Sequence, residues 1–108
     1  MSIALYKYDN AVVPAERNVI YCQPLSTEEI YLKHLLPAVK HLDLRLIFDG
    51  SEIKLADKET FICELRSLKD YLTKYDKDVC PYLLPRIDKM LNDIDQLLMT
   101  DNDAVYLF

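Results

Sequence analysis

The chain has 108 residues, of which 51% are apolar and 29% are charged, a balance typical of one folded domain rather than of a disordered segment. It carries 13 basic and 18 acidic side chains, a formal charge of −5, which disfavours binding to nucleic acid or to an acidic membrane surface. Its single glycine, Gly50, excludes the glycine-rich loops that hold phosphates in P-loop and dinucleotide-binding proteins, and no cofactor is expected.

The sequence points to a cytoplasmic protein. Its first residues lack a basic region followed by a long apolar run, and no stretch reaches the roughly 18 apolar residues of a membrane span. The cysteines, Cys22, Cys63 and Cys80, are widely spaced and odd in number, unlike a secreted disulfide framework. We therefore expect all of them to be reduced thiols.

Two strands are predicted at the start of the chain. Residues 3–8 and 18–22 are short segments rich in tyrosine and aliphatic side chains, as strands are. Residues 9–17 between them are too many for a tight hairpin. Pro24 is expected to end the second strand, because proline cannot donate a hydrogen bond to a neighbouring strand.

The next predicted element is a helix that begins at Thr27. Ser26 and Glu29 have the spacing of a capping box, in which each side chain accepts a hydrogen bond from the other residue's backbone N–H. An apolar stripe of helical period follows. Pro37 lacks the N–H donor that the helix needs, so the helix should kink or end near Leu36.

A β-hairpin is predicted next. Residues 42–48 and 51–55 alternate between apolar and polar side chains, and Asp49-Gly50 separates them. Asp-Gly between alternating segments is a strong hairpin signal, because a type I′ turn needs a positive φ at both central residues. The side chains expected to face the core from the first strand are Leu44, Leu46 and Phe48.

Two further helices and a last strand complete the predicted fold. Apolar periodicity predicts a helix over 58–75, capped by Asp57, and another that starts near Pro81 and ends near Met99. The aliphatic and aromatic residues 104–108 are expected to pair inside the sheet. The predicted order is ββαββααβ, a single α+β domain over 1–108 with a mostly antiparallel sheet and three helices.

No catalytic or metal-binding pattern is present. His34 and His41 lie two helical turns apart, whereas zinc ligands on one helix are normally three or four residues apart. No nucleophile elbow positions a serine or cysteine, and Cys80 before Pro81 is typical of a small apolar residue at a helix boundary. We expect neither an enzyme nor a metal site.

The excess negative charge is concentrated at the C-terminal end. Residues 1–86 hold 13 acids and 12 bases, whereas residues 87–108 hold five acids and one base. Asp101 and Asp103 lie just beyond a predicted helix C-terminus, where the helix dipole disfavours anions. Because the unfavourable charges are kept at this position, they are compatible with a role in binding a partner. Such charges are equally often part of a solvated face that keeps the protein soluble.

These features resemble the immunity proteins that bacteria pair with polymorphic toxins, including contact-dependent growth inhibition toxins. The resemblance covers the whole chain: residues 46–55 lead directly into the amphipathic helix 58–75, and an acid-rich helix follows. It implies that the protein binds a cognate basic toxin, often a nuclease, and covers its active site, with no catalytic residue of its own. An acidic surface would attract such a cationic site and speed the encounter.

The candidate partner-binding residues are therefore acidic. The first choice is the C-terminal set, Asp88, Asp95, Asp101 and Asp103, and the second is the predicted hairpin tip, Asp49 and Glu52. The alternative function is a non-catalytic adaptor or regulatory subunit that binds another protein through the same surface or through a sheet edge. A pocket that brings His34 or His41 together with carboxylates would instead favour an enzyme.

Overall fold

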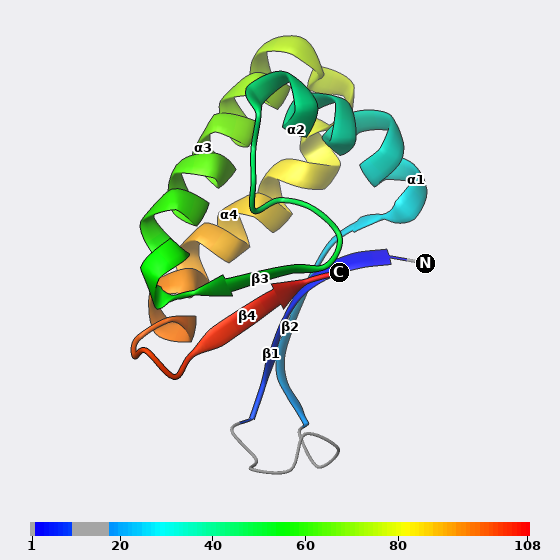
Figure 1. Ribbon diagram of the computed structural model, residues 1–108. Helices are drawn as coiled ribbons and strands as arrows, with labels where there is room; N and C mark the ends of the chain where they lie inside the picture. The colour runs from blue at the N-terminus through cyan, green and yellow to red at the C-terminus, as the bar shows by residue number, and fades with distance from the viewer. Residues whose placement is uncertain (1, 10–17) are drawn as a thin grey trace.

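The computed structural model describes residues 2–9 and 18–108, and most of the predicted connection between the first two strands lies outside these residues. The described chain has an α+β fold in which helices cover one face of a four-stranded antiparallel sheet (Figure 1). The order of the elements is ββαβααβ, one strand fewer than predicted. The strands are β1 (Ser2–Tyr8), β2 (Val19–Thr27), β3 (Ser51–Lys54) and β4 (Ala104–Leu107).

The C-terminal strand lies in the middle of the sheet. The spatial order is β2-β1-β4-β3, and every neighbouring pair is antiparallel. Tyr106 of β4 is opposite Tyr6 on one side and Glu52 on the other. The prediction that residues 104–108 pair inside the sheet is confirmed for Ala104–Leu107.

The second strand is longer than the sequence predicts. β2 continues through Pro24, which is opposite Ala4, and ends at Thr27. The prediction that Pro24 ends the strand is wrong, because β2 is an edge strand. A proline on an edge strand can direct its missing donor away from the ladder, so no bond between strands is lost.

One continuous helical segment follows β2. It consists of α1 (Glu28–Ile30), a π-helical turn (Tyr31–Leu35) and α2 (Leu36–Leu42). The cap lies one residue later than predicted, since the Thr27 hydroxyl, and not that of Ser26, accepts the Ile30 N–H at 3.2 Å. The helix does not end before Pro37; instead Leu36 N–H binds Tyr31 O, five residues back, which changes the helical geometry at the predicted position.

The predicted strand over residues 42–48 is absent, and this part of the prediction is wrong. Asp43 has a left-handed backbone with φ 55°, which ends α2 and is incompatible with a strand. The Glu64 Oε1 atom accepts the backbone N–H groups of Arg45 and Leu46, each at 2.9 Å, so these donors need no partner strand. Burial alternates only as far as Leu46: Leu44 and Leu46 are half-buried against the core, as predicted, but Ile47 is buried and Phe48 is exposed, the reverse of the predicted pattern.

The Asp49-Gly50 turn exists but does not join two strands. The Phe48 carbonyl accepts the Ser51 N–H at 3.3 Å, and Gly50 has φ 97°. Asp49 does not have a positive φ, so the predicted type I′ turn is wrong. A positive φ at the third position alone is the requirement of a type II turn.

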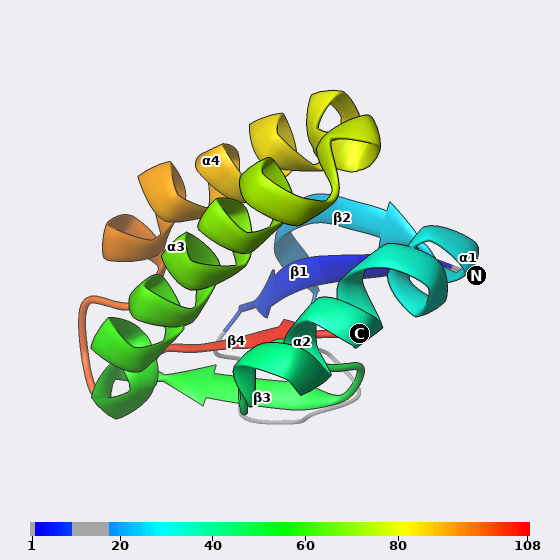
Figure 2. The same ribbon diagram turned by 90° about the horizontal axis from the view of Figure 1, so that it is seen from above.

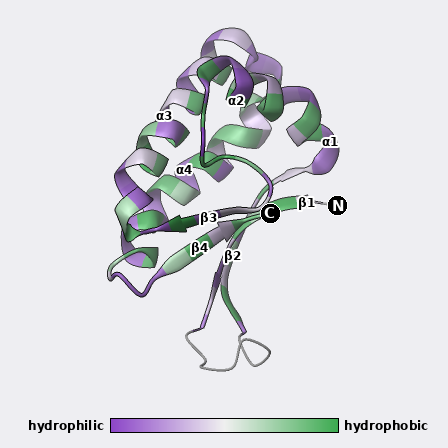
Figure 3. Cartoon of the chain, viewed as in Figure 1, coloured by the Kyte–Doolittle hydropathy of each residue, from purple (hydrophilic) through white to green (hydrophobic). Residues whose placement is uncertain are grey.

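The two long helices pack against the sheet and against each other. They are α3 (Lys58–Tyr75), with the predicted bounds, and α4 (Cys80–Leu97), which begins slightly earlier and contains Pro85. The prediction that Asp57 caps α3 is wrong, because the Asp57 carboxylate accepts the Lys54 N–H at 3.2 Å instead. They lie side by side, with α4 in contact with β2 and α3 in contact with β3 (Figure 2). Hydrophobic and hydrophilic residues alternate along both helices, as expected when one face is buried (Figure 3). The fully buried core includes Leu5, Ile53, Val105, Phe61, Leu65, Leu68, Ile87, Met90 and Ile94.

Candidate protein interaction surface

The face of the sheet opposite the helices carries a cluster of aromatic rings. Side chains alternate across a strand, so Leu5 is in the core while its neighbour Tyr6 is on the other face. The Tyr6 ring lies 4.8 Å from that of Phe108 and 6.4 Å from that of Tyr8, and the Tyr8 and Tyr106 rings are 5.7 Å apart. The helices of the described chain lie on the far side of the sheet (Figure 1). We call these four rings and the sheet surface around them the aromatic face.

The strand register places a predicted binding residue on this face. Cys22, Tyr6, Tyr106 and Glu52 lie opposite one another in a single row across all four strands. Glu52 was predicted as part of a hairpin tip, and the structure places it instead beside the aromatic rings on the outer strand. Its side chain is exposed, and its carboxylate is 3.5 Å from the Lys54 Nζ atom.

A hollow with acidic walls lies at one end of the aromatic face. Its volume is about 280 Å³, and we call it the acidic hollow. The predicted residues Glu52 and Asp101 line it together with the rings of Tyr8 and Tyr106. In the described part of the chain the exposed Asp101 carboxylate makes no hydrogen bond or ion pair. This end of the face therefore combines aromatic surface with an unpaired negative charge.

A second hollow, mainly apolar, lies at the other end of the aromatic face. Its volume is about 260 Å³, and we call it the apolar hollow. Tyr31 forms part of the wall of this hollow, and its hydroxyl donates a hydrogen bond to the Ile47 carbonyl oxygen at 3.2 Å. Burial, with the charge of the nearby Asp49 carboxylate, raises the pKa of Tyr31. The residues that line it are Ser2, Ile3, Tyr6, Glu28, Tyr31, Leu32, Phe108 and the predicted binding residue Asp49.

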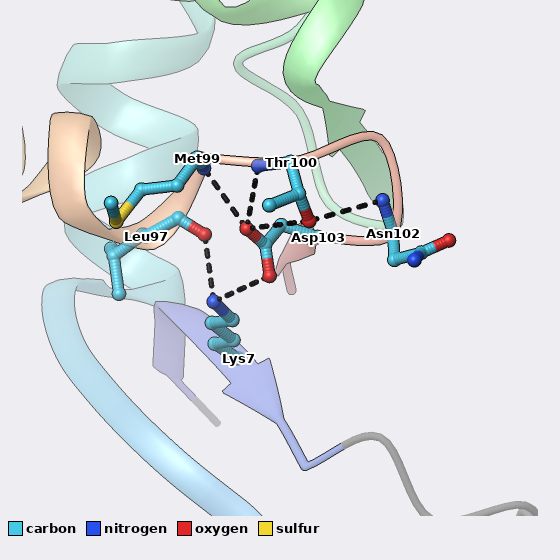
Figure 4. Close-up of polar contacts among 6 residues, drawn as sticks. All are labelled: Lys7, Leu97, Met99, Thr100, Asn102 and Asp103. Atoms are coloured by element: carbon cyan, nitrogen blue, oxygen red, sulfur yellow. Dashed lines mark hydrogen bonds and ion pairs between the residues drawn. The ribbon is translucent and has the colours of Figure 1, made fainter.

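Asp103, which also lines the acidic hollow, holds a turn together through its side-chain hydrogen bonds. Its Oδ2 atom accepts the backbone N–H groups of Met99 and Thr100, each at 2.9 Å, and its Oδ1 atom is 3.0 Å from the Lys7 Nζ atom (Figure 4). Lys7 also donates to Leu97 O at 2.8 Å. The bond from Lys7, followed by the two backbone bonds, holds the pKa of Asp103 well below its usual range. This carboxylate therefore fastens the end of α4 to β1.

The other predicted aspartates lie on the helical layer. Asp88 and Asp95 are on α4, and each is paired with a lysine of α3: Lys69 at 2.6 Å from Asp88, and Lys58 at 2.8 Å from Asp95. These lysines partly neutralise them. The predicted set is therefore divided: Asp49, Glu52, Asp101 and the hydrogen-bonded Asp103 border the aromatic face, whereas the α4 pair lies elsewhere.

Each histidine lies beside a carboxylate or an aromatic ring. The His34 Nδ1 atom is 2.6 Å from a carboxylate oxygen of Asp76, and the His41 ring lies 5.2 Å from that of Tyr71. His41 and Ser67 line the same shallow hollow with Asp70, but no hydrogen bond joins the Ser67 hydroxyl to the imidazole in the described structure. Among residues 2–9 and 18–108, no cluster of three or more His, Cys, Asp or Glu side chains is arranged to hold a metal ion.

Sequence reasoning missed the aromatic face. The signal that could have revealed it is a pair of aromatic residues two positions apart in each of two strands, Tyr6 with Tyr8 and Tyr106 with Phe108. Such spacing places both rings of a strand on the same face. The apolar hollow carries no comparable signal, because Ile3, Leu32 and Phe108 come from distant parts of the chain.

The comparisons with known proteins give no relative. No protein-family model, no curated protein and no solved structure matches this chain. In the part of the chain that the structure describes, no helix is both long and apolar enough to cross a membrane. The functional assignment therefore depends on the chemistry of the surface.

Proposed function

We propose that this protein is a cytoplasmic, non-catalytic inhibitor that binds and neutralises a basic protein toxin, as the immunity proteins that it resembles do. The toxin that we favour is a nuclease. It docks on the aromatic face, so that its active site is covered in the complex. The observation that carries this proposal is a cluster of four aromatic rings, on the face of the sheet opposite the described helices, with an acidic border.

The aromatic rings supply the contact area that binding needs. Tyrosine and phenylalanine are enriched in interface cores, because their rings bury much apolar surface and lose little side-chain freedom on binding. Phe108 is 42% exposed at the end of the cluster. A partner that covers this face removes the exposed apolar surface from water, which stabilises the complex.

The border of the face supplies charge complementarity. Among the described residues, and apart from Asp103, five carboxylates line the acidic and apolar hollows, against one lysine, Lys54, so these side chains carry a net charge of −4. A nuclease active site is cationic because it holds phosphates. The acidic border attracts that site and raises the association rate, which protects the cell before the toxin can act.

The test compares two sets of substitutions with the same chemistry. The partner used is the purified product of a toxin gene that neighbours this one, and association rates are measured over a series of salt concentrations. The face variant combines Asp49→Asn, Glu52→Gln and Asp101→Asn, and the control combines Asp88→Asn with Asp95→Asn.

We expect the face variant to associate more slowly than the wild type, most clearly at low ionic strength, because steering weakens as salt screens it. The control should keep the wild-type rate, and the wild-type protein should inhibit the toxin's enzymatic activity. Wild-type rates for the face variant at every salt concentration, or no binding by the wild-type protein, would contradict the proposal.

One observation favours the alternative, an adaptor or regulatory subunit that binds through a sheet edge. The edge strand β2 has no charged side chain, and Ile20 on it is 60% exposed. Proteins usually protect such an edge with charge or with proline, and β2 has Pro24 near its end but no charge, so its first residues can pair with another strand. Sedimentation at micromolar concentration tests this alternative: self-association that Ile20→Lys abolishes would support it, and a monomeric wild-type protein would not.

A further inference from the structure

We infer that the apolar hollow is a binding site for a single arginine side chain of the protein partner. The inference rests on the proposed function, and it names the residue that the partner inserts and the place where it is held. The observation behind it is an apolar hollow of about 260 Å³ that is lined by two carboxylates from separate elements.

The walls of the hollow suit an aliphatic chain. Ile3 and Tyr31 form part of the core, whereas Leu32 and Phe108 are 54% and 42% exposed. Large apolar side chains that are left exposed beside a hollow gain from being covered. The volume is slightly below the roughly 300–1,000 Å³ of small-molecule sites, so it suits one inserted side chain.

The charge of the hollow suits a cation. Glu28 is the first residue of α1, and Asp49 comes from the turn before β3, so the fold brings together carboxylates 21 positions apart in the sequence. In the described chain neither carboxylate makes an ion pair or a hydrogen bond. The ligand that fits both features has an apolar stem and a cationic end, as the long basic side chains do.

Arginine fits this hollow better than lysine. Its planar guanidinium has five donors in a fixed arrangement, so one group can bond both carboxylates. The same plane can stack on an aromatic ring, and the rings of Tyr6 and Phe108 lie 4.8 Å apart at the wall of the hollow. A lysine ammonium is a compact charge that offers neither the planar surface nor the forked donors.

The experiment uses two small probes and needs no partner. N-acetyl-arginine methylamide is titrated into the ¹⁵N-labelled protein, and N-acetyl-citrulline methylamide, which has nearly the same shape without the charge, is titrated separately. We expect saturable shifts of the amide signals of Leu32, Asp49 and Phe108, with the citrulline probe bound about fivefold more weakly, the upper end for exposed ion pairs.

Variants assign the effect to this hollow. Glu28→Gln combined with Asp49→Asn should reduce arginine binding to the level of the citrulline probe, and Leu32→Ala should weaken both probes. Glu52→Gln, in the acidic hollow, is the matched control and should change neither. Equal affinity for the two probes, or arginine shifts that only Glu52→Gln removes, would overturn the inference.

The outcome is independent of the proposed function. Arginine binding at this hollow together with no binding of the toxin would leave the hollow as a cation site and remove the proposed inhibitor. Toxin binding that the face variant slows, together with no arginine binding here, would keep the inhibitor and remove this site.

Discussion

The Glu64 carboxylate organises the segment between α2 and β3, and its removal gives the sharpest stability prediction. Glu64 is only 8% exposed, and its Oε1 atom accepts both the Arg45 and the Leu46 backbone N–H at 2.9 Å. Glu64→Met keeps a side chain of similar length and removes both acceptors. Glu64→Gln removes the charge but keeps a carbonyl oxygen that can accept both hydrogen bonds.

The two variants should differ clearly in the free energy of unfolding. A hydrogen bond to a charged group contributes about 1.5–3 kcal/mol, and a buried donor left without a partner costs a similar amount. Because both donors are partly buried and water can reach them in part, we expect Glu64→Met to cost about 2–4 kcal/mol. Glu64→Gln should cost about 1 kcal/mol, since only the charge assistance is lost.

Urea unfolding followed by circular dichroism measures both values. Glu59→Gln, an exposed acid in the first turn of the same helix, is the control and should change the unfolding free energy by less than about 0.5 kcal/mol. If Glu64→Met were as stable as the control, the Glu64 hydrogen bonds would not be what holds residues 43–48 in place. Equal losses in the Met and Gln variants would show that the charge matters rather than the acceptor.

Three further predictions concern stability. Gly50→Val should cost about 1–3 kcal/mol in thermal unfolding, because a β-branched residue is strained at φ 97°, although an added Cβ would meet no atom within 4 Å beyond residues 49–51; an unchanged melting curve would contradict this. Deletion of 104–108 should abolish cooperative unfolding, since β4 is the neighbour of both β1 and β3; a soluble, cooperatively folding truncation would refute it. Tyr21→Phe should lower the free energy of unfolding in urea by about 1 kcal/mol, because the Tyr21 hydroxyl donates to Asp93 at 2.7 Å and lowers the pKa of that carboxyl. Wild-type stability would show that this hydrogen bond does not stabilise the fold.

The elements that could be predicted from the sequence are those whose signal is local. The apolar period fixes Lys58–Tyr75 as a helix, and the aliphatic and aromatic composition of residues 104–108 identifies a strand. Residues 42–48 alternate between apolar and polar side chains as a strand would, but contacts with distant parts of the chain decide their structure. The partner of β3 is β4 from the other end of the chain, and Glu64 occupies the amides that a strand would have offered.

The candidate site could be predicted only in part, for a related reason. The charge count correctly identifies an acidic protein, but the pairing of each charge depends on residues distant in sequence. Asp103 is bonded to Lys7, 96 positions away, whereas Asp101 two residues earlier has no hydrogen-bond or ion-pair partner among residues 2–9 and 18–108. The aromatic face needs β1 and β4 side by side, and no local pattern says that they are neighbours.

Asp101 and Asp103 therefore form a matched pair that separates folding from binding. Asp103→Asn replaces one of the two carboxylate oxygens by an amide nitrogen, so either the bond to Lys7 or the bonds to Met99 and Thr100 are lost. Asp101→Asn removes only an exposed charge. At neutral pH we expect Asp103→Asn to unfold at a lower urea concentration than the wild type. Asp101→Asn should unfold at the same urea concentration as the wild type.

The dependence of stability on pH gives a second way to separate the roles of Asp101 and Asp103. The pKa of Asp103 is lowered in the folded protein, so its carboxylate stabilises the fold above the unfolded value of about 3.9, and the stabilisation is lost as pH falls below that value. Wild-type and Asp101→Asn proteins should therefore lose stability together on acidification, while Asp103→Asn loses less because its contribution is already gone. Parallel curves for Asp103→Asn and wild type would place the acid sensitivity in other carboxylates. Slower association with the partner for Asp101→Asn, at full stability, would then identify it as a binding charge.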